Sequence, residues 1–197
     1  MTASPDSLQL RSPPAENPAL ALREFGDDSR QPLRFYLYQD VLEELTFAAR
    51  YDERIYGAIL LGGFGVEDGT GFIEVTGFTG ACWVEGVQDL YEELRPACDA
   101  WIQSRPDDAI VGLFVAVAGS HGRVDEEMAR IHFSLFNIPF QPLLVLDPES
   151  GELALSARAP GTKLFNAAFR AVAVRATESL NDEVRSGTPV SASSEEE

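Results

Sequence analysis

Two long apolar runs dominate the pattern of hydrophobic and polar positions along the chain. They read IYGAILLGGF over Ile55–Phe64 and AIVGLFVAVAG over Ala109–Gly119. Continuous runs of this length are typical of strands that are buried on both faces. Turn-forming residues at Glu67–Gly71 follow the first run, and GFIEVTGFTGA over Gly71–Ala81 then returns, which predicts an antiparallel hairpin. The glycines at 62–65 fit this hairpin better than a phosphate loop, because no helix follows them.

Apolar residues at three- and four-residue spacing predict four helices. The segments are residues 40–51, 87–103, 125–136 and 163–180. Two further strands are expected over residues 139–148 and 151–157, on either side of an Asp-Pro turn. Interleaved helices and buried strands predict one mixed α/β domain over residues 32–180, in which helices flank a sheet.

The two ends of the chain have a different composition. Residues 1–31 are rich in Pro, Ser and charge, and residues 181–197 form an acidic segment that ends in three glutamates. Neither end has enough apolar surface to offset the entropy of ordering, so both are predicted to be disordered. The terminal Glu195–Glu197 run is interpreted as a solubilising tail, with docking to a basic partner as the alternative.

The charge of the chain excludes several kinds of partner. Among 197 residues, 32 are acidic and 15 are basic, for a formal net charge of −17. Nucleic acids and anionic membranes are bound largely through Lys and Arg, so neither is an expected partner. No run approaches the ~20 apolar residues of a membrane helix, and the N-terminus does not have the pattern of a secretory signal. The sequence therefore predicts a cytoplasmic protein that binds neither nucleic acid nor membrane.

The two cysteines, Cys82 and Cys98, are too few for a disulfide framework and match no metal-binding spacing. They are predicted to be reduced and half-buried thiols. The alternative is a nucleophilic cysteine assisted by His121 or His132.

The histidines are the other source of candidate chemistry. His121 lies in a glycine-flanked loop close to Asp125, and His132 lies on a predicted helix. A catalytic zinc ion takes three protein ligands and a water molecule, so His121, Asp125 and His132 form one candidate metal set. The alternative is one loop imidazole and one partly buried helix imidazole, with no metal.

Four stretches of the chain resemble the MPN (JAMM) domain, a family of metal-dependent isopeptidases and their inactive scaffold relatives. They are YDERIYGAILLGGF after a helix, the strand ending in IVGLFVAVAG, the segment IHFSLFNIPFQPLLVLDPESGEL, and a C-terminal helix. The resemblance implies a curved β-sheet flanked by helices. In active members, two His and one Asp hold a zinc ion, and a catalytic Glu moves a proton from the metal-bound water.

The residues at the family's metal-binding positions are not metal ligands. Val115 and Val117 take the positions of the two His, with Ala116 and Ala118 in place of the Ser and Pro between and after them. Met128 takes the position of the metal-binding Asp. An aliphatic side chain has no lone pair for zinc, so the resemblance implies that this member holds no metal and no cofactor.

The remaining family positions are altered as well. The family's Ser falls near Asp125, and Arg54 stands at the position of the catalytic Glu, with Glu53 one residue away. No catalytic residue is therefore assigned.

Metal-free members of this family pair with another MPN domain or organise a larger complex. The resemblance thus implies a catalytically inactive scaffold or protein-interaction module that forms a homo- or heterodimer. The alternative is a hydrolase, with a displaced metal site built from Glu53, His121, Asp125 and His132 or with a catalytic Cys. A third hypothesis is an acidic partner of a basic protein that acts through its tails.

Overall fold

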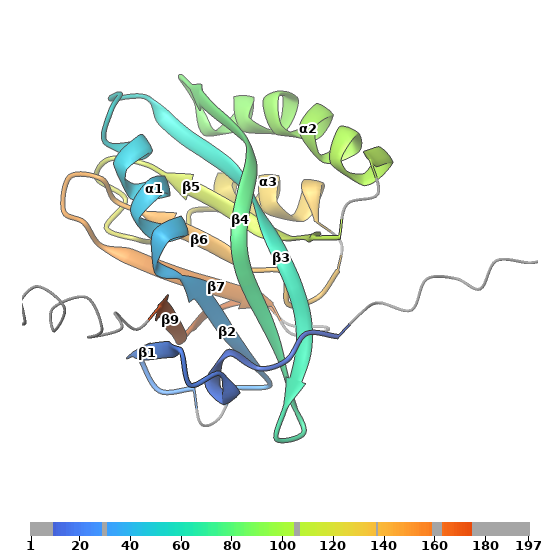
Figure 1. Ribbon diagram of the computed structural model, residues 1–197. Coiled ribbons are helices and arrows are strands. Elements are labelled where there is room, and N and C mark those ends of the chain that lie inside the picture. The colour runs from blue at the N-terminus through green and yellow to red at the C-terminus, as the bar shows by residue number, and fades with distance from the viewer. Residues whose placement is uncertain (1–9, 29–30, 105–106, 137, 159–162, 175–197) are drawn as a thin grey trace, which may run out of the picture.

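The computed structural model describes residues 10–28, 31–104, 107–136, 138–158 and 163–174. In this part of the chain, nine strands form one mixed sheet in the order β1-β9-β2-β4-β3-β5-β6-β7-β8, and three α-helices flank it (Figure 1). The mixed α/β fold class predicted from the sequence is confirmed. The acidic segment 181–197 and residues 1–9, which were both predicted to be disordered, lie outside the described residues.

The elements alternate along the chain as follows. The strands are β1 (Leu20–Phe25), β2 (Leu33–Tyr38), β3 (Ile55–Glu67), β4 (Thr70–Val84), β5 (Ala109–Ala116), β6 (Leu143–Leu146), β7 (Leu153–Arg158), β8 (Leu164–Ala167) and β9 (Phe169–Val174). The α-helices are α1 (Gln39–Ala49), α2 (Leu90–Ser104) and α3 (Glu126–Leu135), with 3-10 turns at Pro14–Glu16 and Val87–Asp89.

The predicted hairpin is present and longer than expected. Strands β3 and β4 pair antiparallel from Ile55↔Val84 to Glu67↔Thr70. Asp68 and Gly69 form the turn with φ angles of 51° and 77°, values that glycine tolerates at no steric cost. A Cβ at Gly62 would lie 1.7 Å from the carbonyl oxygen of Glu74 on β4, so this glycine permits the close approach of the two strands.

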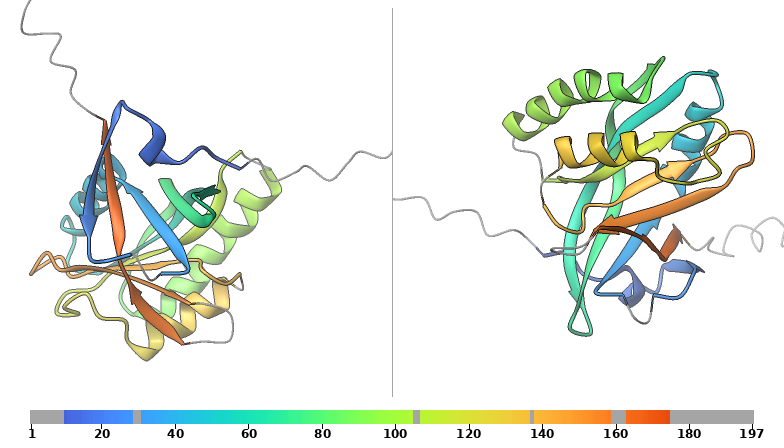
Figure 2. Two further views of the ribbon diagram at one scale, coloured as in Figure 1. Left: turned by 90° about the horizontal axis from the view of Figure 1, so that it is seen from below. Right: turned by 180° about the vertical axis from the view of Figure 1, so that it is seen from behind.

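The two faces of the sheet are covered by different helices. On one face, Val41 and Leu45 of α1 pack with alternate residues of the central strands, such as Leu60 and Phe114. On the other face, α2 and α3 pack against the intervening residues, among them Ile59 and Leu113. Seen from behind, α2 and α3 lie in front of the sheet and α1 lies beyond it (Figure 2). The central strands are therefore buried on both sides, as their apolar runs predicted.

The N-terminal prediction requires a correction. Residues 1–31 were predicted to be disordered, but Leu20–Phe25 forms strand β1 and pairs antiparallel with β9. Strand β2 (Leu33–Tyr38) was not predicted and joins the sheet in parallel with β4. Leu20 and Leu22 of β1 pack beside a small buried cluster of Tyr36, Phe72 and Val172. This burial stabilises a segment whose local composition alone favours disorder.

The predicted C-terminal helix is also wrong over the described residues. Residues 163–180 were expected to be helical, but 164–167 and 169–174 form strands β8 and β9. The segment is rich in Ala, Phe and Val, so its apolar residues satisfy both a helical and an alternating pattern. Pairing of β9 with β1 and β2, and of β8 with β7, decides between them. Residues 175–180 lie outside the described residues.

A single residue, Ala168, separates β8 from β9, although these strands occupy distant places in the sheet order. The chain bends there, and the sheet curls so that its two ends approach each other (Figure 2). Gln31 fastens the bend, because its amide accepts from the Ala168 N–H at 2.6 Å and donates to the Ala168 carbonyl at 3.1 Å. Among the described residues, no helix is long and apolar enough to cross a membrane.

Candidate functional site

The positions assigned to metal ligands by the family resemblance lie in an apolar environment. Val115 on β5 and Met128 on α3 are 0% and 1% exposed, and both belong to the apolar cluster beneath α2 and α3. Val117 is half-buried and packs against the same cluster. Ala116 points to the opposite face, beneath α1, and Ala118 is exposed. These side chains form a hydrocarbon wall and offer no nitrogen or oxygen ligand.

Arg54, which stands at the position of the catalytic Glu, precedes β3 and is exposed. Its guanidinium grips the carboxylate of Asp52, with Nη2 2.8 Å and Nε 3.1 Å from the two oxygens. These bonds hold the pKa of Asp52 down at about 2. The neighbouring Glu53 is exposed and joins no group of potential metal ligands among the described residues.

The candidate set His121, Asp125 and His132 is not brought together. Asp125 caps α3, accepting from the Met128 N–H at 2.7 Å. His132 is 3% exposed and donates through Nε2 to the Gln141 carbonyl at 3.0 Å, while its Nδ1 has no partner among the described residues. Burial lowers the pKa of His132 to about 4, so its imidazole is neutral at physiological pH.

His121 meets two acids that the sequence analysis did not select. Within the described residues, a group of three potential metal ligands is formed by His121, Asp147 and Glu152, whose ligand atoms all lie within 4.8 Å of one another. Nδ1 of His121 is 3.2 Å from Glu152 Oε2 and 3.8 Å from Asp147 Oδ2. The sequence signal was DPESGE, a segment that was interpreted only as a turn.

Asp147 is largely occupied by the backbone of these loops. Its carboxylate accepts from the backbone N–H of His121 at 2.9 Å, of Glu149 at 3.0 Å and of Ser150 at 3.3 Å. Hydrogen bonds from these amides, that of His121 first, lower the pKa of Asp147 to about 2. The carboxylate therefore joins the loop after β5 to the turn after β6, and a metal ion would have to compete with those bonds.

The two cysteines are free thiols. Cys98 is buried and Cys82 is half-buried. Burial raises the pKa of both thiols to about 11, so the nucleophilic thiolate is scarce at neutral pH. This environment disfavours the alternative of a catalytic cysteine.

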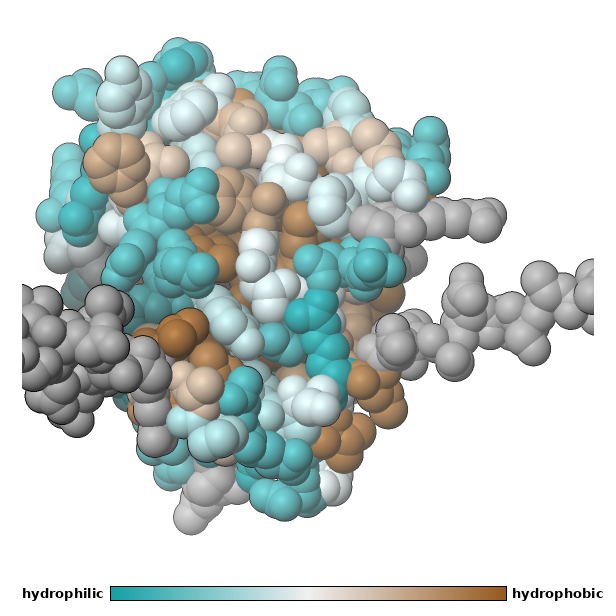
Figure 3. Space-filling view, viewed as in Figure 1, coloured by the Kyte–Doolittle hydropathy of each residue, from teal (hydrophilic) through white to brown (hydrophobic). Residues whose placement is uncertain are grey.

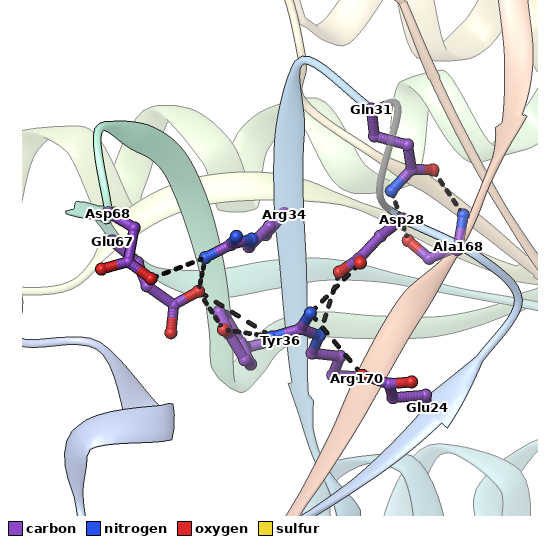
Figure 4. Close-up of polar contacts among 9 residues, drawn as sticks. All are labelled: Glu24, Asp28, Gln31, Arg34, Tyr36, Glu67, Asp68, Ala168 and Arg170. Carbon is purple, nitrogen blue, oxygen red and sulfur yellow. Dashed lines mark hydrogen bonds and ion pairs between the residues drawn. The ribbon is translucent and has the colours of Figure 1, made fainter.

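A cluster of buried charges joins the strands at the curled end of the sheet (Figure 4). Arg170 of β9 lies against Asp28, with its Nε and Nη2 2.9 and 3.1 Å from the carboxylate oxygens, and donates to the Tyr36 hydroxyl at 3.2 Å. Tyr36 in turn donates to Glu67 at 2.6 Å, and Arg34 also pairs with Glu67. Burial, reinforced by Glu67, raises the pKa of Tyr36 to about 12.

The charges of this cluster are balanced within it. Its arginines face carboxylates from β3 and from the β1–β2 connection, so the cluster ties strands β2, β3 and β9 together. Its geometry fits a structural role better than substrate binding.

An open groove of about 450 Å³ runs between α1 and the strands β1 and β9. Its apolar lining is Phe25, Leu42, Phe47 and Ala171, and its polar lining is Arg23, Gln39, Glu43, Thr46 and Arg50. Phe25 also borders a second hollow of about 700 Å³ between the β1–β2 connection and β8. On the face that carries α1, apolar side chains interrupt a mostly hydrophilic surface (Figure 3).

Comparisons with protein families and with curated proteins find no match. Among solved structures, the solution structure of protein DSY2949 from Desulfitobacterium hafniense is similar, with a TM-score of 0.46 and 15% sequence identity. The similarity covers 67% of this chain and 88% of that chain.

Proposed function

We propose that this chain is a catalytically inactive, MPN-like protein-interaction module of the cytoplasm. It works by pairing with a second MPN-like domain or by docking to another protein. The proposal depends on one observation: Val115 and Met128, which stand where the family's metal ligands would be, are packed in the apolar core. A buried site filled with hydrocarbon needs no metal to neutralise it.

The arrangement of the elements supports the proposal in part. The order of α1, the β3–β4 hairpin, α2, β5, α3 and β6 follows three of the four stretches that carry the resemblance. The fourth stretch, a C-terminal helix, has no counterpart, because residues 164–174 lie in β8 and β9. The proposal therefore depends on the central elements and not on the C-terminal segment.

Metal analysis and light scattering of the full chain test this function. The purified protein is incubated with zinc, passed over a desalting column and measured by atomic emission spectroscopy. We expect no stoichiometric zinc, and a mass greater than that of one chain when the partner is a second copy. One zinc ion retained per chain would overturn the proposal.

A hydrolase with a displaced metal site is the second candidate, and the approach of His121 to Asp147 and Glu152 favours it. Cleavage of a ubiquitin-like fusion protein in the presence of zinc, lost in the His121→Ala variant, would support this candidate. Asp125→Asn is the matched control, because Asp125 caps α3 and lies outside that group. Equal inactivity of the parent and both variants would exclude this candidate on that substrate.

A further inference from the structure

The groove between α1 and the β1–β9 pair exists because the sheet extends beyond the helix that covers it. Arg23 and Phe25 of β1 lie opposite Ala171 and Phe169 of β9, and the rings of Phe25 and Phe169 stack at 4.7 Å. Phe169 belongs to the core beneath α1, whereas Phe25 is 38% exposed. The apolar face of the sheet therefore continues from the core into the open groove.

Helix α1 contributes an unusually exposed aromatic side chain to this groove. Phe47 is 76% exposed, and Leu42, one to two turns earlier, lines the groove from the same helix. An exposed aromatic residue beside an apolar floor is typical of the anchors at protein interfaces.

The charges around the groove differ in sign from the molecule as a whole. Arg23 and Arg50 line it, and neither forms an ion pair with any described residue. The acid that lines it, Glu43, accepts a hydrogen bond from Gln39 at 2.7 Å. Two uncompensated arginines in a chain of net charge −17 make the groove a local site for carboxylates.

Strand β1 adds backbone groups to the same place. It stands at the end of the sheet order, with β9 as its one neighbour among the described strands. The outer edge of such a strand carries N–H and C=O groups that an extended segment can pair with. An extended occupant would thus reach the edge of β1, the apolar floor and the two arginines together.

We propose that this groove binds an extended, acidic peptide segment of a partner protein. An apolar side chain of the segment packs against Phe47 and Phe25, and its carboxylates pair with Arg23 and Arg50. This assignment rests on the proposed function, since it names the surface through which the module docks. A second copy of the chain is a poorer occupant, because two molecules of net charge −17 repel each other.

Selection from a random dodecapeptide library displayed on phage, against the full chain, tests the assignment. We expect the selected peptides to be enriched in Asp and Glu around one aromatic or large aliphatic residue. The affinity of a synthetic copy, measured by fluorescence anisotropy, should fall at least about tenfold in Phe47→Asp and in Arg23→Glu/Arg50→Glu. It should also weaken as the salt concentration rises.

Exposed residues elsewhere provide matched controls. Ile102→Asp on α2 and Arg123→Glu after β5 make the same chemical changes away from the groove, and both should bind the peptide like the parent. Peptides without acidic enrichment, or equal binding by groove and control variants, would overturn the assignment. So would competition by a synthetic peptide of residues 175–197, which would make the chain's own segment the occupant.

Zinc content is measured on the same preparations so that the two proposals can fail separately. Retained zinc together with groove-dependent peptide binding would overturn the inactive-module function and leave the groove assigned. Metal-free protein that binds no selected peptide would overturn the groove alone.

Discussion

At the scale of single residues, burial decides which of the reactive side chains remain reactive. His132 and both cysteines are titratable or nucleophilic groups in the sequence, yet each is held in its neutral form by the apolar surroundings. His121 is the exception, because it lies on the surface beside two carboxylates. Residue type therefore gives the list of candidates, and the environment removes most of them.

His132 makes the stability of the fold depend on pH. The folded protein holds this imidazole neutral down to a pKa of about 4, against a model value of 6.5, so the unfolded state binds more protons between these two values. Stability from this group is complete above pH ~6.5, falls as the pH decreases and is lost by pH ~4, a change of about 3 kcal/mol.

Urea unfolding at a series of pH values measures this effect. His132→Gln, which can still donate to the Gln141 carbonyl, should lose that part of the pH dependence. His121→Gln should behave like the parent over the same range. If the His132→Gln and parent curves run parallel, His132 is not the group responsible.

Arg170 is the central charge of the buried ion-pair cluster, and its removal leaves carboxylates without a partner. In Arg170→Met, Asp28 loses its partner and Glu67 retains Arg34 alone. Uncompensated buried charge costs about 3 kcal/mol of unfolding free energy, measurable by urea denaturation. The exposed pair of Arg95 and Asp99 on α2 provides the control, since Arg95→Met should leave the midpoint nearly unchanged. Equal effects of the two substitutions would contradict a stabilising role of burial.

At the scale of elements, long-range pairing overrides local preference at both ends of the domain. Residues 163–180 have the Ala content of a helix, and residues 1–31 have the Pro and Ser content of a disordered segment. Yet 20–25 and 169–174 pair with each other as β1 and β9. Their partners are about as far apart in the sequence as the chain allows, which is why windows of local sequence could not reveal them.

Gln31 fastens the bend between β8 and β9 and so couples these two segments. Gln31→Ala removes both side-chain bonds to Ala168 and leaves its N–H and carbonyl unpaired, at a cost of about 1–2 kcal/mol. Hydrogen exchange should accelerate first in β1 and β9, as followed by NMR. Gln39→Ala removes an exposed bond on α1 and should leave exchange in these strands unchanged. Uniform acceleration over the whole sheet would show that the bend is not a local fastening.

At the scale of the whole molecule, the charge of −17 opposes the compact state. Screening by salt relieves this repulsion, whereas the buried pairs around Arg170 are screened less. Raising sodium chloride from about 50 to about 500 mM should therefore stabilise the fold by about 1 kcal/mol, which corresponds to about 2–4 °C in the midpoint of thermal unfolding. A midpoint that falls with salt would show that surface ion pairs outweigh the net repulsion.

The candidate site was only partly readable from the sequence. The valines and the methionine at the family's ligand positions were identified by resemblance, and their side chains lie in the core. Asp147 and Glu152 were missed, because a turn of the form Asp-Pro-Glu-Ser-Gly has an ordinary structural explanation. The groove was missed entirely, since Phe25, Phe47 and Ala171 come from three elements that no sequence window contains.

The sequence by itself determined the mixed α/β class, the central hairpin, the three helices and the strands around the Asp-Pro turn. These features follow from local periodicity and turn chemistry, which act between near neighbours in the chain. Only the tertiary structure decided that β1, β8 and β9 are strands, that His121 meets Asp147 and Glu152, and that a groove remains beside α1. Each of these depends on contacts between distant segments, whose free energy is set by packing and pairing rather than by local propensity.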